Sequence, residues 1–166
     1  MPSDWTIRDL RPRETELLRL ATLTNMNWSG EQRFSFRDLD MDPALRHYYA
    51  FDADRGDLGF VAMAMATSEA TVVLGVVWLL FLDSTDPGYG FVADGVPELS
   101  VCVWPGYRGL GIGRALIDHA LVEAGSKGIR RVSLSVEDGN PAVNLYLQRG
   151  FAPVPGASAG TLSVSL

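Results

Sequence analysis

Apolar positions along the chain form two kinds of pattern: short runs typical of β-strands, and longer stretches with the spacing of amphipathic helices. The strand-like runs cover residues 5–10, 57–67, 72–82, 97–104, 131–136, 151–154 and 161–166. The second and third runs show little alternation, which predicts strands buried on both faces of a central sheet. Residues 68–71 between them predict the turn of a hairpin.

Helical spacing occurs in the stretches between these runs. It predicts helices at residues 11–24, 112–126 and 140–149, and one or two short helices within residues 29–49, where Pro43 interrupts the pattern. The second helix has an apolar stripe expected to face the core, formed by Ile112, Leu116, Ala120 and Ala124. Gly128 is placed to end that helix, and Asn140 followed by Pro141 is a typical helix start.

The order of these elements predicts the fold class. Strands and helices follow one another as β-α-α-β-β-β-α-β-α-β-β, which predicts an α/β fold with a mixed sheet of about seven strands and helices on both faces. The 166 residues fit the usual range of about 100 to 200 residues per domain, and no linker or repeat divides them. We therefore expect residues 1–166 to form a single domain.

Charge and cysteine content narrow the classes of partner. The formal net charge of −6 argues against nucleic acid, because binding to phosphates requires a basic face. It weakly favours a cationic partner, although solubility alone also explains it. Cys102 is the single cysteine, so no intrachain disulfide and no cysteine-based zinc site is expected, and we predict no metal site.

The N-terminal residues lack the apolar core of a secretory signal, since Asp4, Arg8 and Asp9 lie among them. The longest apolar run, residues 72–82, is far shorter than the ~20 residues of a membrane helix. We expect a cytoplasmic protein that does not enter a membrane.

A glycine-rich segment, Arg108-Gly109-Leu110-Gly111-Ile112-Gly113, lies between a predicted strand and a predicted helix. The unpaired N–H groups and the positive end of the helix dipole point into such a turn and favour anions. Three glycines let a phosphate approach the backbone, and Arg108 adds a positive charge.

Other interpretations of the glycines remain. A Walker loop requires a Lys-Ser/Thr pair, but Ile112 and Gly113 follow Gly111. The dinucleotide fingerprint is closer, because Glu137 ends the next strand, yet its third glycine position is Leu116. Glycines of an ordinary connecting loop are the third alternative.

The motif Arg108-x-x-Gly111-x-Gly113, preceded by Val-Trp-Pro-Gly-Tyr at residues 103–107, resembles the acetyl-CoA pyrophosphate signature of the GCN5-related N-acetyltransferase (GNAT) family. The resemblance covers about residues 98–151 and continues through Asn140-Pro141-Ala142, Leu145-Tyr146 and Gly150-Phe151. It implies a mostly antiparallel seven-stranded sheet. It also implies transfer of the acetyl group of acetyl-CoA to a primary amine of a small molecule or peptide.

The resemblance implies a role for each matching residue. Backbone N–H groups would hold the pyrophosphate beside Arg108, from Gly109, Leu110, Gly111, Ile112, Gly113 and Arg114. The pantetheine arm would bind the backbone of Val101, Cys102 and Val103, where the fourth and fifth strands separate. Asn140 would contact the cofactor and Tyr146 its sulfur. The interval from Asn140 to Tyr146 is one residue shorter than is usual in the family, so Asn140 as a helix cap alone is the alternative.

Two residues are candidates for proton transfer. An ammonium group with a pKa of ~10.4 must lose a proton before it attacks, and Glu98 shares a strand face with Ser100 and Cys102 close to the expected thioester. The alternative for Glu98 is a surface carboxylate at a strand end. Tyr146 would donate a proton to the departing thiolate, or would be a core aromatic beside Val143.

Direct attack of the amine is preferred to an acyl-enzyme on Cys102, because neither His47 nor His119 is apparent beside that thiol. A non-catalytic acyl-CoA sensor and a nucleotide-binding oxidoreductase are the rival functions, and a homodimer is an ordinary form for such enzymes. Aromatic residues that would line an acceptor cleft are Trp28, Phe34, Phe36, Tyr48, Tyr49, Tyr89 and Phe91.

Overall fold

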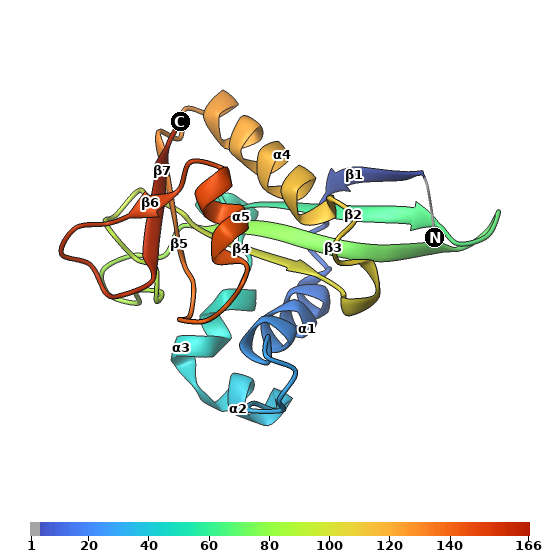
Figure 1. The fold of residues 1–166 in the computed structure, drawn as a ribbon, viewed down its shortest axis with the longest axis horizontal. Coiled ribbons are helices and arrows are strands. Elements are labelled where there is room, and N and C mark those ends of the chain that lie inside the picture. The colour runs from blue at the N-terminus through green and yellow to red at the C-terminus, as the bar shows by residue number, and fades with distance from the viewer. Residues whose placement is uncertain (1–3) are drawn as a thin grey trace.

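The computed structural model describes residues 4–166, which form one central sheet with helices on both faces (Figure 1). The strands are β1 (Trp5–Asp9), β2 (Leu58–Met65), β3 (Thr71–Leu80), β4 (Glu98–Val103), β5 (Arg131–Ser135), β6 (Ala152–Pro153) and β7 (Thr161–Ser165). Across the sheet their order is β1-β2-β3-β4-β5-β7-β6. Every neighbouring pair is antiparallel except β4 and β5, so the predicted mixed, mostly antiparallel seven-stranded sheet is confirmed.

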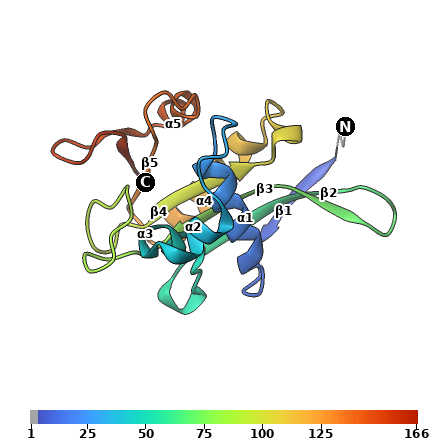
Figure 2. The same cartoon turned by 90° about the horizontal axis from the view of Figure 1, so that it is seen from below.

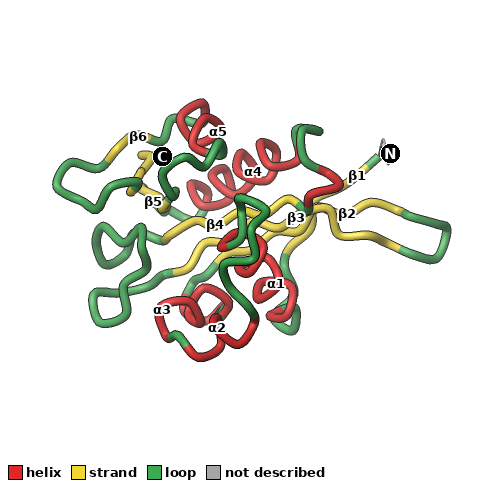
Figure 3. The backbone as a smooth tube through the Cα atoms, turned by 60° about the horizontal axis from the view of Figure 1, so that its bottom comes forward, coloured by secondary structure: helices red, strands yellow, loops and turns green. Residues whose placement is uncertain are grey.

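Helices cover the two faces of the sheet in separate groups (Figures 2 and 3). On one face lie α1 (Thr15–Met26), α2 (Phe36–Met41), α3 (Pro43–Arg46) and the 3-10 turn η1 (His47–Tyr49). On the other lie α4 (Ile112–Ser126) and α5 (Val143–Gln148), as Figure 1 shows. Two further 3-10 turns are η2 (Ala53–Arg55) and η3 (Pro105–Tyr107). None of the helices in residues 4–166 has both the length and the apolar character that crossing a bilayer requires.

Two apolar clusters hold these layers together. The predicted stripe of α4 is confirmed, since its four residues are at most 1% exposed and belong to the larger cluster. Val77 and Leu79 of β3 face this cluster, whereas Val76 and Trp78 face α1. The central strand β3 is therefore buried on both faces, as the continuous apolar run predicts. Gly128 ends α4 in a left-handed conformation at φ 82°.

The sheet nearly divides between β4 and β5. A single parallel pair, Glu98 with Ser133, joins them, and Ser133 N–H donates to the carbonyl of Pro97 at 3.0 Å. Beyond this pair the two strands separate. We call this gap beyond Glu98 and Ser133 the seam. Along the seam, the later residues of β4 have no strand partner on the β5 side.

Several helix boundaries differ from the prediction. Helix α1 starts at Thr15 rather than at residue 11, because the Glu14 carboxylate accepts from the Arg11 N–H at 2.8 Å and from Arg8 at 2.7 Å, which holds a turn there. Pro43 starts α3 rather than only interrupting a helix. The regular part of α5 begins at Val143, three residues after Asn140.

Candidate functional site

The glycine turn before α4 is an open and uncapped helix N-terminus. Gly109 and Gly111 have φ angles of 76° and 80°, a left-handed conformation that residues with a Cβ rarely adopt. A Cβ on either residue would meet nothing within 4 Å, so space over the turn is free. No side chain caps α4, and the first N–H to bond back into the helix is that of Ala115, to Gly111. The N–H groups before it are available to an anion.

Arg108 lies at the border between this turn and β4. Its Nε donates to the carbonyl of Val103 at 3.0 Å, and the side chain is exposed. The contact holds the positive charge beside the end of the strand. Gly113 lies in the first turn of the helix, where a Cβ would make ordinary contacts with Leu145 and Val103 at 3.5 Å.

Backbone groups of β4 point alternately toward β3 and toward the seam. Trp104 donates its N–H to Leu74 on β3, so Cys102, two residues earlier, also directs its backbone groups to β3. Val101 and Val103 therefore direct theirs into the seam. Of the three residues expected to bind a pantetheine arm, Cys102 is turned away, because its backbone pairs with Val76 instead.

Tyr146 projects from α5 and is only 9% exposed. Burial raises the pKa of its phenol to about 12, and the Cys102 thiol acts in the same direction. Within residues 4–166 its hydroxyl takes part in no hydrogen bond, although the ring packs edge-on against Phe151 at 6.1 Å. The phenol is thus neutral at physiological pH and keeps a proton to donate. Leu147, one residue on, is 48% exposed, so α5 does not bury all of its apolar residues.

Glu98 begins β4 and is 4% exposed, not a surface carboxylate. Its Oε1 accepts from the Tyr48 hydroxyl at 2.7 Å and from the Gly90 N–H at 3.0 Å. Burial raises the pKa of this carboxyl above its usual range, against the opposing effect of the Tyr48 and Gly90 hydrogen bonds. A carboxyl of raised pKa can accept a proton near neutral pH.

Glycines make the enclosure of Glu98 possible. A Cβ on Gly88 would occupy the position of the Glu98 Oε2, and one on Gly90 would lie 2.5 Å from the backbone of Leu134. These two glycines flank Tyr89, whose N–H donates to the Tyr48 hydroxyl at 2.7 Å. The sequence analysis missed this arrangement, and the Gly-Tyr-Gly pattern at residues 88–90 was the one local signal of it.

Asn140 closes the turn before α5 and is not the N-cap of the helix itself, which is Ala142. The Asn140 Oδ1 accepts from the Ala142 N–H at 3.0 Å, which stabilises the turn that leads into α5. This bond accounts for the residue without a ligand, and contact with a cofactor stays a prediction.

Glu137 is the acidic residue that a dinucleotide-binding site would require, and its carboxylate already has partners within the protein. Arg33 donates to its carboxylate at 2.6 Å and Trp28 at 2.8 Å, and the Arg33 guanidinium holds the pKa of Glu137 at about 2. These contacts join the segment between α1 and α2 to the segment after β5. They occupy the carboxylate that a dinucleotide ribose would need.

Cys102 does not have the surroundings of a nucleophile. Burial raises the pKa of its thiol to about 12, so the reactive thiolate is scarce. His119 packs against Phe60 at 4.6 Å, and His47 bonds Asp86 at 2.9 Å, so both histidines have other partners.

Several of the aromatic residues expected to line a cleft have partners within the fold. Tyr49 donates to Asp40 at 2.6 Å, and Arg19 lies 4.3 Å from the Phe36 ring. Tyr89 is 54% exposed and stacks on Tyr48 at 6.1 Å, which places it at the surface above Glu98.

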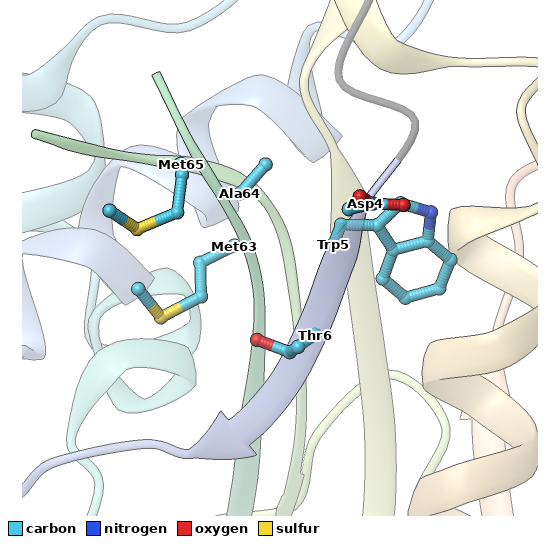
Figure 4. Close-up of a pocket in the computed structure, with 6 residues that line it drawn as sticks. All are labelled: Asp4, Trp5, Thr6, Met63, Ala64 and Met65. Atoms are coloured by element: carbon cyan, nitrogen blue, oxygen red, sulfur yellow. The ribbon is translucent and has the colours of Figure 1, made fainter. Parts of the chain in front are cut away.

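Two hollows on the surface of the described residues bear on the site. One of about 520 Å³ lies beside α2 and α3 and is lined by Arg33, Phe34, Asp38, Met41, Asp42, Pro43 and Leu45. The other, of about 330 Å³, lies at the β1 edge of the sheet, where residues 4–6 run beside residues 63–65 of β2 (Figure 4). Trp5 is paired with Ala64, and its side chain points away from Met63 and Met65. Strand β3 separates this second hollow from β4 and the glycine turn.

Comparisons with known proteins agree with this geometry. Streptothricin acetyltransferase of Streptomyces lavendulae is 26% identical in an alignment 165 positions long, and the alignment covers 90% of this chain and 82% of that protein. A GNAT-family acetyltransferase of Staphylococcus aureus Mu50 superposes with a TM-score of 0.70 at 19% identity, over 98% of this chain and 99% of that one. Spermidine N-acetyltransferase of Vibrio cholerae, in complex with CoA and spermine, gives 0.60 at 20% identity, over 98% and 96%.

The model of the family described as "Acetyltransferase (GNAT) family" matches residues 17–151. That range includes the glycine turn, β4, the seam and α5. The chain therefore belongs to the GNAT family of acetyltransferases.

Proposed function

We propose that this protein transfers the acetyl group of acetyl-CoA to a primary amine on a small cationic molecule, by direct attack of the amine. Membership of the family makes acetyl-CoA the acyl donor. The observation that carries the proposal is the open turn at Gly109 and Gly111. This turn follows β4, and the free edge of β4 lines the seam.

The residues of the turn and the seam fit such a donor. The uncapped N–H groups of residues 109–114, with Arg108 beside them, suit a pyrophosphate. The backbone groups of Val101 and the N–H of Val103 suit an extended amide-bearing arm, because they point into the seam. When bound, the donor supplies an activated thioester and a thiolate leaving group.

The chain's own residues move the protons. Glu98 takes up the proton that the attacking amine loses, through the Tyr48 hydroxyl or a water chain, because the carboxyl itself is enclosed. The neutral phenol of Tyr146 donates a proton to the departing sulfur. Strand N–H groups at the seam polarise the thioester oxygen.

A cationic acceptor suits the charge of the chain. The formal net charge is −6, and Asp38 and Asp42 line the hollow beside α2 and α3. Burial raises the pKa of the Tyr89 phenol, and the charge of Asp42 acts in the same direction. The relatives named for streptothricin and spermidine support a small molecule that carries more than one amine.

The test is thiol release from acetyl-CoA with a panel of polyamines, amino-sugar antibiotics, amino acids and lysine peptides. We expect release with a small polyamine or antibiotic, and we expect Glu98→Gln to move the rising limb of the pH–rate profile to higher pH. Thiol release without any added amine is the control for hydrolysis. Binding of acetyl-CoA without release by any amine would instead support the non-catalytic sensor.

A further inference from the structure

A second set of buried polar groups lies around the proposed base. Glu98, Tyr48, His47 and Asp86 come from β4, from η1 and from the loop that joins β3 to β4. The proposed function uses Glu98 but leaves His47 and Asp86 without a role. The inference below rests on that proposed function, because it concerns the ionisation of its base.

The Glu98 carboxyl has one satisfied oxygen and one unsatisfied oxygen. Oε1 accepts hydrogen bonds from Tyr48 and Gly90, whereas Oε2 is buried and meets no hydrogen-bond partner in residues 4–166. A proton on this carboxyl therefore belongs on Oε2, since Oε1 already accepts two donors. A buried polar atom without a partner is unfavourable, so a group or water that shares a hydrogen bond with Oε2 would stabilise it.

His47 presents the complementary atom. Its side chain is 6% exposed, and its Nδ1 lies 2.9 Å from the Asp86 carboxylate, which is an acceptor only. Nδ1 must therefore carry a proton. That assignment leaves Nε2 as the acceptor of a neutral ring, and Nε2 is likewise buried without a partner in the described chain.

Tyr48 contacts both of the residues that carry an unsatisfied atom. The His47 ring packs edge-on against the Tyr48 ring at 4.6 Å, and the Tyr48 hydroxyl bonds Glu98 at 2.7 Å. A positive charge on His47 acts on the Glu98 carboxyl, whose pKa it lowers against the larger effect of burial. Tyr89 is a further titratable neighbour: its backbone N–H donates to the Tyr48 hydroxyl, and its ring stacks on the Tyr48 ring at 6.1 Å.

We propose that His47, held in one tautomer by Asp86, shares a proton with Glu98 and so keeps this buried base available as a carboxylate. In the step, the O–H bond at Oε2 breaks and an N–H bond forms at Nε2, and one water passes the proton between them, because the two atoms are not within hydrogen-bond distance of each other. The product is a carboxylate beside an imidazolium that also bonds Asp86. His47 and Asp86 are thus positioning residues, and neither contacts the reacting atoms.

The first test measures the protonation state of the His47 ring by NMR, in the protein without acetyl-CoA or amine. The chain has two histidines, so nitrogen-15 signals of the His47 ring can be assigned by their loss in His47→Gln. We expect Nδ1 to keep its proton in the neutral ring, and Asp86→Asn to shift the proton toward Nε2. We expect Glu98→Gln to change the Nε2 signal. A neutral His47 protonated on Nε2, or an Nε2 signal unaffected by Glu98→Gln, would overturn the proposal.

The second test reads the pH–rate profile of acetyl transfer. Without the positive charge of His47, Glu98 ionises only at higher pH, so His47→Gln should move the rising limb to higher pH. Asp86→Asn should move it in the same direction by less. The matched control is His119→Gln on α4, which should leave the limb where it is.

An unmoved limb in both His47→Gln and Asp86→Asn would also refute the proposal. If no amine in the panel releases thiol, the proposed function is contradicted instead. The nitrogen-15 signals of His47 can still be measured in that case, so the proposal about His47 is tested separately. The exposed Asp86 keeps the test available if His47→Gln does not fold.

Discussion

At the scale of single residues, Tyr146 offers the sharpest test of the chemistry. Tyr146→Phe keeps the ring that packs against Phe151 and removes only the hydroxyl. If that hydroxyl supplies a proton to the leaving sulfur, kcat should fall on the order of 10²-fold, with acetyl-CoA affinity little changed. Steady-state kinetics and direct titration of the donor measure the two quantities. Full kcat in the variant would show that the tyrosine has only a packing role.

The burial of Glu98 also predicts how stability depends on pH. Its pKa is raised in the folded protein, so between its ordinary value and the raised value the folded chain holds a proton that the unfolded chain has lost. The free energy of unfolding therefore falls as pH rises through this window. Glu98→Gln cannot ionise and should lose less stability over the same pH range. Denaturant titrations at several pH values measure the free energy of unfolding of both proteins. If this free energy depended on pH in the same way in Glu98→Gln as in the unmodified protein, the raised pKa of Glu98 would be contradicted.

Sequence reasoning selected Glu98 and Tyr146 but not the groups that surround Glu98. Tyr48 lies 50 positions from Glu98, and Arg33 lies 104 positions from Glu137. No periodicity or short motif connects residues at such separations. Only the folded chain shows that Glu98 is enclosed rather than exposed at a strand end.

At the scale of elements, the glycine turn can be tested with a matched pair of variants. A ligand that binds only the folded protein adds ~2.7 kcal/mol to stability at a hundredfold excess over Kd, so acetyl-CoA should raise the melting temperature, and NAD and ATP much less. Gly111→Val should abolish this rise by placing a branched side chain over the N–H groups.

Gly156→Val is the control for that variant. Gly156 has a φ of 78° and, like Gly111, free space around a Cβ, but it lies in the loop between β6 and β7. Both variants should lose roughly 1 to 2 kcal/mol from the left-handed backbone, and only Gly111→Val should lose the response to acetyl-CoA. A response retained in Gly111→Val would remove the turn from the donor site.

Element types were predictable from the sequence, whereas several boundaries were not. Helical spacing extends back to residue 11, but the bonds of Glu14 to Arg8 and Arg11 hold a turn until Thr15. Likewise Asn140 caps a turn, and the regular helix follows at Val143. In both cases a side-chain hydrogen bond decides the boundary, and apolar periodicity does not record it.

At the scale of the whole molecule, the order of strands and helices was sufficient for the fold class. Apolar runs gave seven strands, and the spacing of α4 gave the face that it buries. The separation of β4 from β5 had no signal in the local pattern, because both strands have a regular alternation of side chains along their whole length. The resemblance of the glycine motif to the family implied it, and the single pair of Glu98 with Ser133 now gives it a definite position.

That single pair also determines how the molecule should carry a mechanical load. The N-terminal strand β1 belongs to the part of the sheet that three antiparallel ladders join, and the C-terminal strand β7 belongs to the part that two ladders join. Tension applied between the ends of the chain would meet its weakest lateral connection between β4 and β5. A ligand that bonds to both sides of that gap would act as a brace, so the force needed to part the two halves would report whether the gap is filled.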